Sequence, residues 1–345
     1  MRRAPFAVMP LLAAAACTGL LAPAAPAADL AFTNQVVGTV GTTAGDTKTV
    51  FAAGGTIYTG GNNWGMSTST NGGTSWTNYA TTQGLGGNFV TSVFASGSNI
   101  YAATGFGSTG GLSVSNNGGT SWTIYASGLL GSSVYAEGSR ILLGTATGFL
   151  ISTDNGATWT TRTLANSGLV NNNILGVFSV GNTIYAATDS GLSISTNSGA
   201  SWTNRTAANS GLVNNRMRGV YVLAGTIYAS TRFGLSISTN NGETWTNYTA
   251  ASGLGNNWVN GVSVVGGTIY AATSGGLSVL PDGGASWTNY TTANGLGSNN
   301  VQAVYADGTN VYAATGAGLS IAVVPAPGAV ALLGVAGLAA RRRRR

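Results

Sequence analysis

Few side chains in this chain of 345 residues could take part in acid, base or nucleophilic chemistry. There are eight acidic residues, no histidine and a single cysteine, Cys17. Without histidine, serine–histidine triads and the common zinc sites are excluded. Glycoside hydrolysis needs two carboxylates that face each other across the substrate. Any catalytic site would therefore depend on where the few acids and arginines stand in the fold.

The charge of the chain is concentrated at its two ends. Arg2 and Arg3 open the sequence and five arginines close it, which leaves seven basic residues against eight acidic ones in the body. The body is therefore close to neutral, although the formal net charge of the whole chain is +6. Surfaces that bind nucleic acid carry an excess of lysine and arginine to meet the phosphates. The composition excludes a nucleic-acid partner.

Residues 1–27 have the composition of a secretory signal peptide. Arg2 and Arg3 form the charged start, residues 11–21 are mostly apolar, and residues 25–27 read Ala-Pro-Ala, small residues that a signal peptidase accepts. A lipoprotein signal at Cys17 is a weaker alternative, because apolar residues continue beyond it. Removal of the leader would take away the one cysteine, so the exported chain would contain neither a thiol nucleophile nor a disulfide.

The last segment, residues 324–345, reads VPAPGAVALLGVAGLAARRRRR. Its apolar run over residues 329–340 is shorter than the roughly 20 residues of an ordinary transmembrane helix. The arginines after it would stay on the cytoplasmic side of a membrane. On composition alone, this is a poor membrane anchor or an apolar tail with a solvated run of charge.

The order of a Pro-x-Pro step, a short apolar helix and an arginine cluster resembles the PEP-CTERM sorting signal. That resemblance implies an exosortase-type processing enzyme as partner, transient association with the inner membrane through the C-terminal helix, and delivery to the surface or extracellular matrix of a Gram-negative-type bacterium. The sequence departs from the family pattern at Ala326, where a glutamate usually stands. The residues that carry the signal are Pro325, Pro327, Arg341, Arg342, Arg343, Arg344 and Arg345.

Between the two end segments the chain is a repeat array. The motif S-x-(D/N)-x-G-x-(S/T)-W, called the box below, recurs with its tryptophans 37 to 46 residues apart, a period typical of propeller blades. In one unit, residues 174–180, 182–188, 192–196 and 202–206 are β-branched or aromatic stretches separated by Gly, Asn and Ser turns. The box tryptophans are Trp76, Trp122, Trp159, Trp202, Trp245 and Trp287.

The ends of the array distinguish a closed ring from a linear solenoid. The last repeat, residues 301–324, supplies three strands and no box, while residues 31–34 (AFTN) resemble the fourth-strand stretch 286–289 (SWTN). A solenoid would need capping units at both ends, and none is visible. The sequence therefore predicts an all-β, seven-bladed β-propeller over residues 28–323, its last blade closed by the N-terminal strand, which removes exposed sheet edges.

The boxes resemble the Asp-box (BNR) motif of sialidases, and the units are also similar to the propeller repeats of two-component regulators. Both resemblances concern the fold and are poor indicators of activity. The acidic position of the box is an acid at Asp154 and Asp282 but an amide in four other boxes. A catalytic carboxylate could not be exchanged so freely, whereas a turn that only accepts hydrogen bonds could. We predict a structural role for the boxes, with the tryptophan as an apolar wedge between blades.

The four strands of each blade should alternate in direction, so alternate loops share a face of the ring. This argument from strand parity places the boxes on one face and the fourth-to-first and second-to-third loops on the other. Five of the fourth-to-first loops share an asparagine, assigned as Asn88, Asn172, Asn215, Asn257 and Asn300. Turn chemistry explains such a set, and a ring of amides for a polar ligand is the functional alternative. The residues that break the repeat on this face form the predicted ligand site: Trp64, Phe106, Asp189, Arg216, Arg218, Arg232, Phe233 and Trp258.

These residues suit binding better than catalysis. Sialidases need an arginine triad, a tyrosine nucleophile and acids, and the arginines of the body are confined to blades three to five. We predict no catalytic residue, no metal and no cofactor. The leading hypothesis is a non-enzymatic surface or matrix protein that binds or scaffolds exopolysaccharide, or another surface protein. The alternatives are a degenerate sialidase-like glycoside hydrolase or lyase and a purely structural coat protein.

Overall fold

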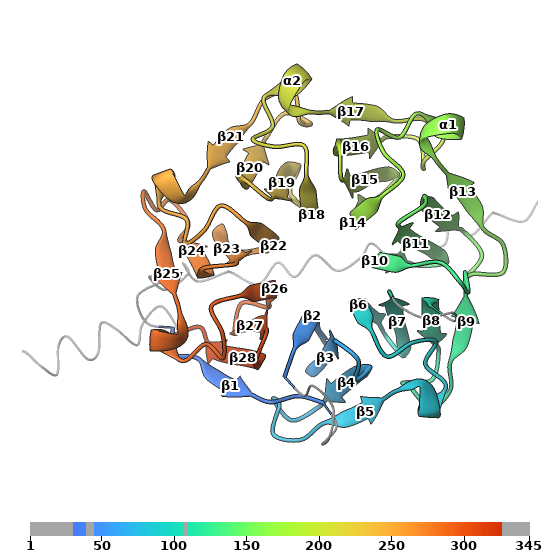
Figure 1. Ribbon diagram of the computed structural model, residues 1–345, viewed down its shortest axis with the longest axis horizontal. Coiled ribbons are helices and arrows are strands. Elements are labelled where there is room, and N and C mark those ends of the chain that lie inside the picture. Colours follow the sequence, from blue (N-terminus) through green and yellow to red (C-terminus); the bar gives the residue numbers. More distant parts are fainter. Residues whose placement is uncertain (1–29, 39–44, 106–109, 326–345) are drawn as a thin grey trace, which may run out of the picture.

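The computed structural model describes residues 30–38, 45–105 and 110–325. In this part of the chain, seven antiparallel sheets of four strands stand around a common axis (Figure 1), which confirms the predicted seven-bladed β-propeller. The predicted signal peptide and the sorting residues Pro327 and Arg341–Arg345 lie outside the described residues. None of the helices described here has the length and apolar character required to cross a bilayer.

Each blade runs from an inner strand beside the axis to a short outer strand. Blades one to three are β2 (Thr47–Ala53), β3 (Thr56–Gly61), β4 (Met66–Ser69), β5 (Thr77–Tyr79); β6 (Val90–Ser96), β7 (Asn99–Thr104), β8 (Gly111–Ser115), β9 (Thr123–Tyr125); and β10 (Gly131–Glu137), β11 (Arg140–Thr145), β12 (Phe149–Ser152), β13 (Thr160–Arg162). Blades four to six are β14 (Ile174–Val180), β15 (Thr183–Thr188), β16 (Gly191–Ser195), β17 (Thr203–Arg205); β18 (Met217–Leu223), β19 (Thr226–Thr231), β20 (Gly234–Ser238), β21 (Thr246–Tyr248); and β22 (Val259–Val265), β23 (Thr268–Thr273), β24 (Gly276–Leu280), β25 (Thr288–Tyr290).

Blade seven is composite. Its three inner strands are β26 (Val301–Ala306), β27 (Asn310–Thr315) and β28 (Gly318–Val323), and its outer strand is β1 (Thr33–Gln35). Thr33 stands opposite Ile321 in the antiparallel pair of β1 and β28, and the backbone N–H of Phe32 donates to the carbonyl oxygen of Asn294 at 3.1 Å. The N-terminal strand therefore closes the ring, as the sequence predicted.

Short helical turns follow five of the outer strands: η2 (Thr81–Gln83), α1 (Leu164–Ser167), α2 (Ala207–Ser210), η3 (Ala250–Ser252) and η4 (Thr292–Asn294). The middle strands of each blade are buried on both faces, because every sheet is covered by two neighbouring blades. Strand β15 has the sequence TIYAAT, and all but its first residue are buried. Its small and apolar residues suit a strand with no solvent-exposed face.

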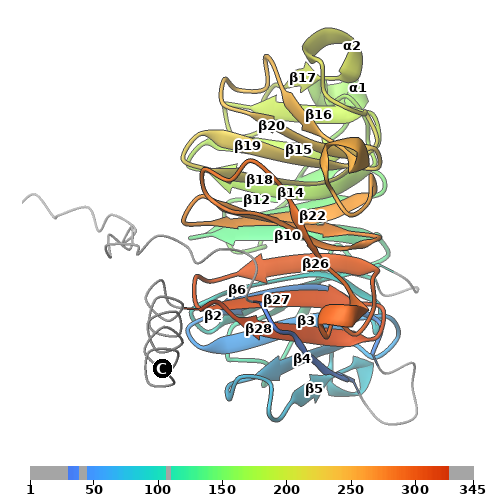
Figure 2. The ribbon, with the colours of Figure 1, turned by 90° about the vertical axis from the view of Figure 1, so that its left-hand side faces the viewer.

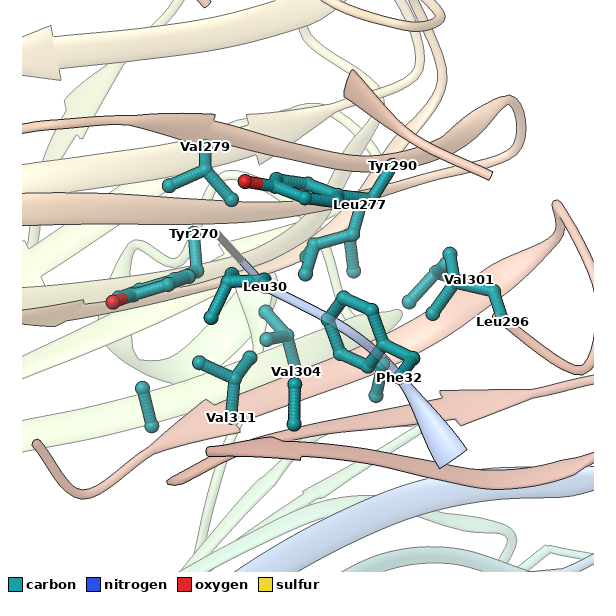
Figure 3. Close-up of a cluster of buried hydrophobic side chains, with 14 residues drawn as sticks. Leu30, Phe32, Tyr270, Leu277, Val279, Tyr290, Leu296, Val301, Val304 and Val311 are labelled. Atoms are coloured by element: carbon teal, nitrogen blue, oxygen red, sulfur yellow. The ribbon is translucent and has the colours of Figure 1, made fainter. Parts of the chain in front are cut away.

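Seven apolar clusters fill the spaces between neighbouring blades. In six of them, the box tryptophan of one blade packs against the preceding blade. In the seventh, between blades six and seven, Phe32 takes that position beside Tyr290 (Figure 3). The box tryptophans that lie in these clusters are Trp76, Trp122, Trp159, Trp202, Trp245 and Trp287.

The box is a hydrogen-bonded turn. Ser238 Oγ accepts from the N–H of Gly242 at 2.9 Å, and Asn240 Oδ1 accepts from the N–H of Thr244 at 3.1 Å. Gly242 has a φ of 76°, and a Cβ there would stand 3.0 Å from the Trp245 ring, so glycine is required. The same two bonds recur in the first four boxes, with an asparagine or an aspartate as acceptor.

The two faces of the ring differ as strand parity predicted. The box turns share a face with the first-to-second turns, where the N–H of Gly118 donates to Ser98 O at 3.1 Å; this is the box face. On the opposite face, the second-to-third loops bond the entrances of the inner strands, as when Arg232 N donates to Arg216 O at 3.0 Å. Helices α1 and α2 belong to the opposite face and lie on the right of the disc in Figure 2.

Candidate functional site

A cavity of about 460 Å³ opens around the axis of the ring, among the entrances of the inner strands. All seven inner strands have a register shift between their first and third residues, as between Ile174 and Gly176 of β14. Such a bulge re-aims the side chain that it inserts. The second residues of the seven strands all line the cavity: Lys48, Thr91, Ser132, Leu175, Arg218, Asn260 and Gln302.

Three of these lining side chains also tie neighbouring blades together. The hydroxyl of Thr91 lies 3.0 Å from Ala103 O and 2.8 Å from Gly131 O of the next blade. Ser132 bonds in the same way across to blade four, and Asn260 Nδ2 donates to Val301 O of blade seven at 2.8 Å. The two hydroxyl protons and one N–H of Asn260 are therefore used within the ring, while the hydroxyl and amide oxygens can still accept hydrogen bonds from a ligand.

An aromatic collar surrounds the axis three residues further along the inner strands. Neighbouring rings in it have centroids 4.9 to 5.1 Å apart. In blade six the position is held by Ser263, whose hydroxyl accepts from Ala306 N at 3.1 Å, so the collar is open on that side. Its members are Phe51, Phe94, Tyr135, Phe178, Tyr221 and Tyr305.

Asp46 organises one side of the cavity mouth. Its carboxylate pairs with Lys48 Nζ at 3.0 Å. It also accepts from Gln302 Nε2 at 2.7 Å and from Asn62 Nδ2 at 3.0 Å. These three partners come from blades one and seven, so the carboxylate joins the two blades that close the ring.

Two arginines and a tryptophan stand together at the other side of the mouth. The guanidinium carbons of Arg218 and Arg232 lie 5.9 and 4.7 Å from the ring centroid of Trp258, within range of cation–π attraction. Both Nε atoms are buried without a hydrogen-bond partner. Burial lowers the pKa of Arg218, and the positive charge of Arg232 lowers it further.

The rim above this pair is exposed. Arg216 Nε lies 3.6 Å from Asp189 Oδ1, and the Arg216 side chain is 55% exposed. Phe233 is 55% exposed and Trp258 is 38% exposed, so large apolar surface meets solvent beside the charged groups. The structure therefore brings together six of the eight predicted residues at one sector of the mouth, where they are exposed or half-buried.

No protein-family model matches the chain, and no curated protein matches its sequence. Solved structures do match it. The extracellular domain assigned to the hybrid two component system BT3049 from B. thetaiotaomicron is 17% identical, with 85% of this chain and 41% of that chain covered and a TM-score of 0.72. YCF48 from Cyanidioschyzon merolae is 14% identical over 86% and 99% of the two chains, with a TM-score of 0.59.

A glycoside hydrolase structure, the GH74 enzyme from Niastella koreensis, is 23% identical over 81% and 43% of the two chains, with a TM-score of 0.57. The present chain spans about two fifths of the BT3049 structure. At such identities the likeness concerns the fold alone. The chain is a seven-bladed β-propeller. Because propellers of this type include an enzyme and an extracellular regulator domain, the fold does not decide the function.

Trp64 does not belong to the predicted ligand site. Only 1% of its surface is exposed, and it packs between blades seven and one of the propeller. Positive φ angles at Asn63 and Gly65 fold its loop inward. The ring then covers Gly61, where no side chain would fit, and its Nε1 donates to Asp46 O at 3.3 Å. Phe106, another predicted member, lies outside the described residues.

The asparagines of the fourth-to-first loops cap turns. Each accepts, through Oδ1, a hydrogen bond of 2.6 to 2.9 Å from a backbone N–H at the start of a helical turn. In the last loop the prediction of Asn300 is wrong by one residue, because Asn299, four residues after Gly295, makes this bond. The set in the propeller is Asn88, Asn172, Asn215, Asn257 and Asn299.

Sequence reasoning missed the lining of the cavity. Lys48, Asn260 and Gln302 occupy the equivalent second positions of β2, β22 and β26, and Asp46 directly precedes β2; none of them is among the residues predicted for the ligand site. A signal was present: the second position of these strands varies among Lys, Thr, Ser, Leu, Arg, Asn and Gln, while the fourth is always valine. Variation at one position within a constant frame indicates a side chain that packing does not dictate.

The described acids near this mouth are held by cations. Asp46 and Asp189 each lie beside a cation, and the box acids Asp154 and Asp282 belong to the box face. Within residues 30–38, 45–105 and 110–325, no three acidic or cysteine side chains gather as metal ligands would. The arrangement offers hydrogen bonding, positive charge and aromatic surface around one cavity.

Proposed function

We propose that this propeller is a non-enzymatic protein of the cell surface or extracellular matrix that binds or scaffolds exopolysaccharide through the cavity of the opposite face. The observation that supports binding is the lining of that cavity. Hydroxyl, amide and guanidinium groups surround it, and the exposed indole of Trp258 stands at its mouth. A few convergent polar groups beside an aromatic surface are typical of small-ligand sites, and sugar rings use both kinds of contact.

The export route is part of the proposal. It rests on the signal-peptide composition of residues 1–27 and on the resemblance of residues 324–345 to the PEP-CTERM signal. An exosortase-type enzyme would remove or transfer the tail after transient contact with the inner membrane. Mass spectrometry of the protein isolated from its native host tests this route. Termini near residue 28 and before Arg341 are expected, and retention of Arg341–Arg345 on exported protein would contradict it.

The absence of catalysis is likewise a proposal. In most glycoside hydrolases the nucleophile or general base is a carboxylate that is free to attack or to take a proton. Asp46 already bonds Lys48, Gln302 and Asn62, and Asp189 stands beside Arg216. Carboxylates held by cations and amides are suited to positioning those groups, so binding without turnover is the function that the geometry supports best.

Residues 28–325 contain all seven blades and both closing strands, so this segment is suitable for the experiment. Affinity electrophoresis against a panel of neutral and acidic polysaccharides should detect saturable binding that Trp258→Ala weakens by about tenfold, an aromatic contact of roughly 1.4 kcal/mol. Ile124→Ala, a similarly exposed apolar residue on the outer strand β9, is the matched control. Release of reducing ends that disappears with Asp189→Asn would overturn the non-enzymatic part of the proposal.

A further inference from the structure

The arginine pair at the cavity mouth carries more positive charge than its surroundings neutralise. Four cations stand around the mouth, and two of them have an acid beside them: Lys48 with Asp46 across the mouth, and Arg216 with Asp189 on the rim. In the described part of the chain, no carboxylate oxygen lies within 4.0 Å of Arg218 or Arg232. The two guanidinium groups are therefore an unpaired positive centre on a nearly neutral protein body.

In the ligand-free protein, this pair of guanidinium groups raises the free energy of the folded state. Both Nε atoms are buried without a hydrogen-bond acceptor, and burying a charged donor in this way costs free energy. The two groups also repel each other: burial first and then the charge of Arg232 lower the pKa of Arg218, and the more distant charge of Asp189 offsets only part of this. Cation–π attraction to one indole offsets about 1–2 kcal/mol and leaves the repulsion in place.

Packing alone does not account for the second arginine. Holding the Trp258 ring needs one cation, and Arg232 is the closer at 4.7 Å. Arg218 occupies the second position of β18, where other blades carry Thr, Ser, Leu or Asn without loss of the fold. An anion placed between the two guanidinium groups would accept from both and remove the repulsion.

We propose that Arg218 and Arg232 bind the carboxylate of an acidic saccharide at the mouth of the cavity. This inference rests on the proposed function and names the class of saccharide. The exposed part of Trp258 would then pack against the sugar ring, and the hydroxyl groups of the ligand would meet the oxygens of Thr91, Ser132 and Asn260 in the cavity. A cavity of about 460 Å³ is within the range that holds small ligands.

Polygalacturonate and its methyl ester provide the test, because they share the sugar ring and differ in the carboxylate charge. Isothermal titration with residues 28–325 should show polygalacturonate bound at least about tenfold more tightly than the ester. In Arg218→Gln/Arg232→Gln this preference should fall by about tenfold or more, which corresponds to one charge-assisted hydrogen bond. Arg218→Lys/Arg232→Lys keeps the positive charge but loses the planar, two-pronged guanidinium group. This variant should retain part of the preference for polygalacturonate over the ester.

The control is Arg162→Gln/Arg205→Gln, which removes the same charge from the outer strands β13 and β17 and should change binding less than twofold. Equal loss in this control, or equal binding of acid and ester, would overturn the inference and leave the proposed function intact. Tighter binding of polyglutamate than of polygalacturonate would assign the site to acidic peptides and overturn it too. Binding of no polysaccharide by protein with an unchanged melting temperature would overturn both proposals.

Discussion

Phe32 meets Tyr290 edge to face, with ring centroids 5.9 Å apart and planes at 70°. One blade earlier, Trp287 meets Tyr248 in the same way at 5.5 Å and 75°. Phe32 therefore stands where the box tryptophan stands in the other blades (Figure 3). Strand β1 is a displaced fourth strand, and the stability of the ring depends on a contact between β1 and the last blades.

Phe32→Ala is expected to lower the free energy of unfolding by about 3–5 kcal/mol, as for a large side chain removed from a packed core. Phe32 is 7% exposed and belongs to the cluster between blades six and seven. Phe32→Trp should cost much less, because six other blades hold a tryptophan there. Denaturant unfolding measures both, with Val36→Ala as the control, since Val36 directly follows β1 and is 67% exposed. Equal effects of the alanine variants would contradict closure by β1.

Trp64 and Trp258 should respond oppositely to substitution. Trp64→Ala removes a ring that is 1% exposed and should destabilise the protein by about 3–5 kcal/mol, with polysaccharide affinity unchanged in the fraction that remains folded. Trp258→Ala loses mainly a cation–π contact, and should cost about 1 kcal/mol of stability while it weakens ligand binding. Thermal unfolding and affinity electrophoresis, run on both variants, separate the two roles. A stable Trp64→Ala variant with impaired binding would restore Trp64 to the ligand site.

The contrast between these tryptophans shows where sequence reasoning works for this fold. The spacing of the boxes and the resemblance of residues 31–34 to residues 286–289 are properties of the repeat, so the seven blades and their closure could be predicted. The burial of Trp64 depends on left-handed backbone at Asn63 and Gly65 and on the missing side chain of Gly61. Spacing carries no information on such local conformations, so a residue that interrupts the repeat, such as Trp64, can still be buried.

The sequence predicts only those residues of the site that visibly interrupt the repeat. Arg216, Arg232 and Trp258 interrupt the repeat in loops of the opposite face, so strand parity sufficed to gather them. Lys48 and Gln302 lie inside regular strands and reach the cavity because each inner strand has a bulge after its first residue. The position of a bulge follows from the pairing of two strands, and one strand read alone does not disclose it.

Asp46→Ala should destabilise the ring closure by about 2 kcal/mol, because the half-buried amides of Gln302 and Asn62 lose their hydrogen bonds to the carboxylate. Asp46→Asn keeps an oxygen acceptor and should cost less. The side chains of Lys48 and Asp46 are about one quarter exposed, so part of the loss should be screened by salt. Denaturant unfolding at low and high ionic strength measures this, with the exposed Glu243→Ala as the control. No coupling between Asp46→Ala and Gln302→Ala in a double-mutant cycle would contradict a joint role.

Asp154 allows the turn role of the box to be separated from its charge. Hydrogen bonds from the hydroxyl and the backbone N–H of Thr158, and from Ser152, lower the pKa of Asp154 from 3.8 to about 2. Since the pKa is lower in the folded state, the carboxylate stabilises the fold above the unfolded value, and this contribution is lost as pH falls from about 4 to about 2. The melting temperatures of Asp154→Asn and the wild type should be most similar at about pH 2. Near neutral pH, the wild type should melt at a modestly higher temperature than the variant. Asp154→Ala should melt lower at every pH, because the N–H of Thr158 then has no acceptor. An asparagine variant as unstable as the alanine variant near neutral pH would contradict the exchange of acid and amide that the other boxes display.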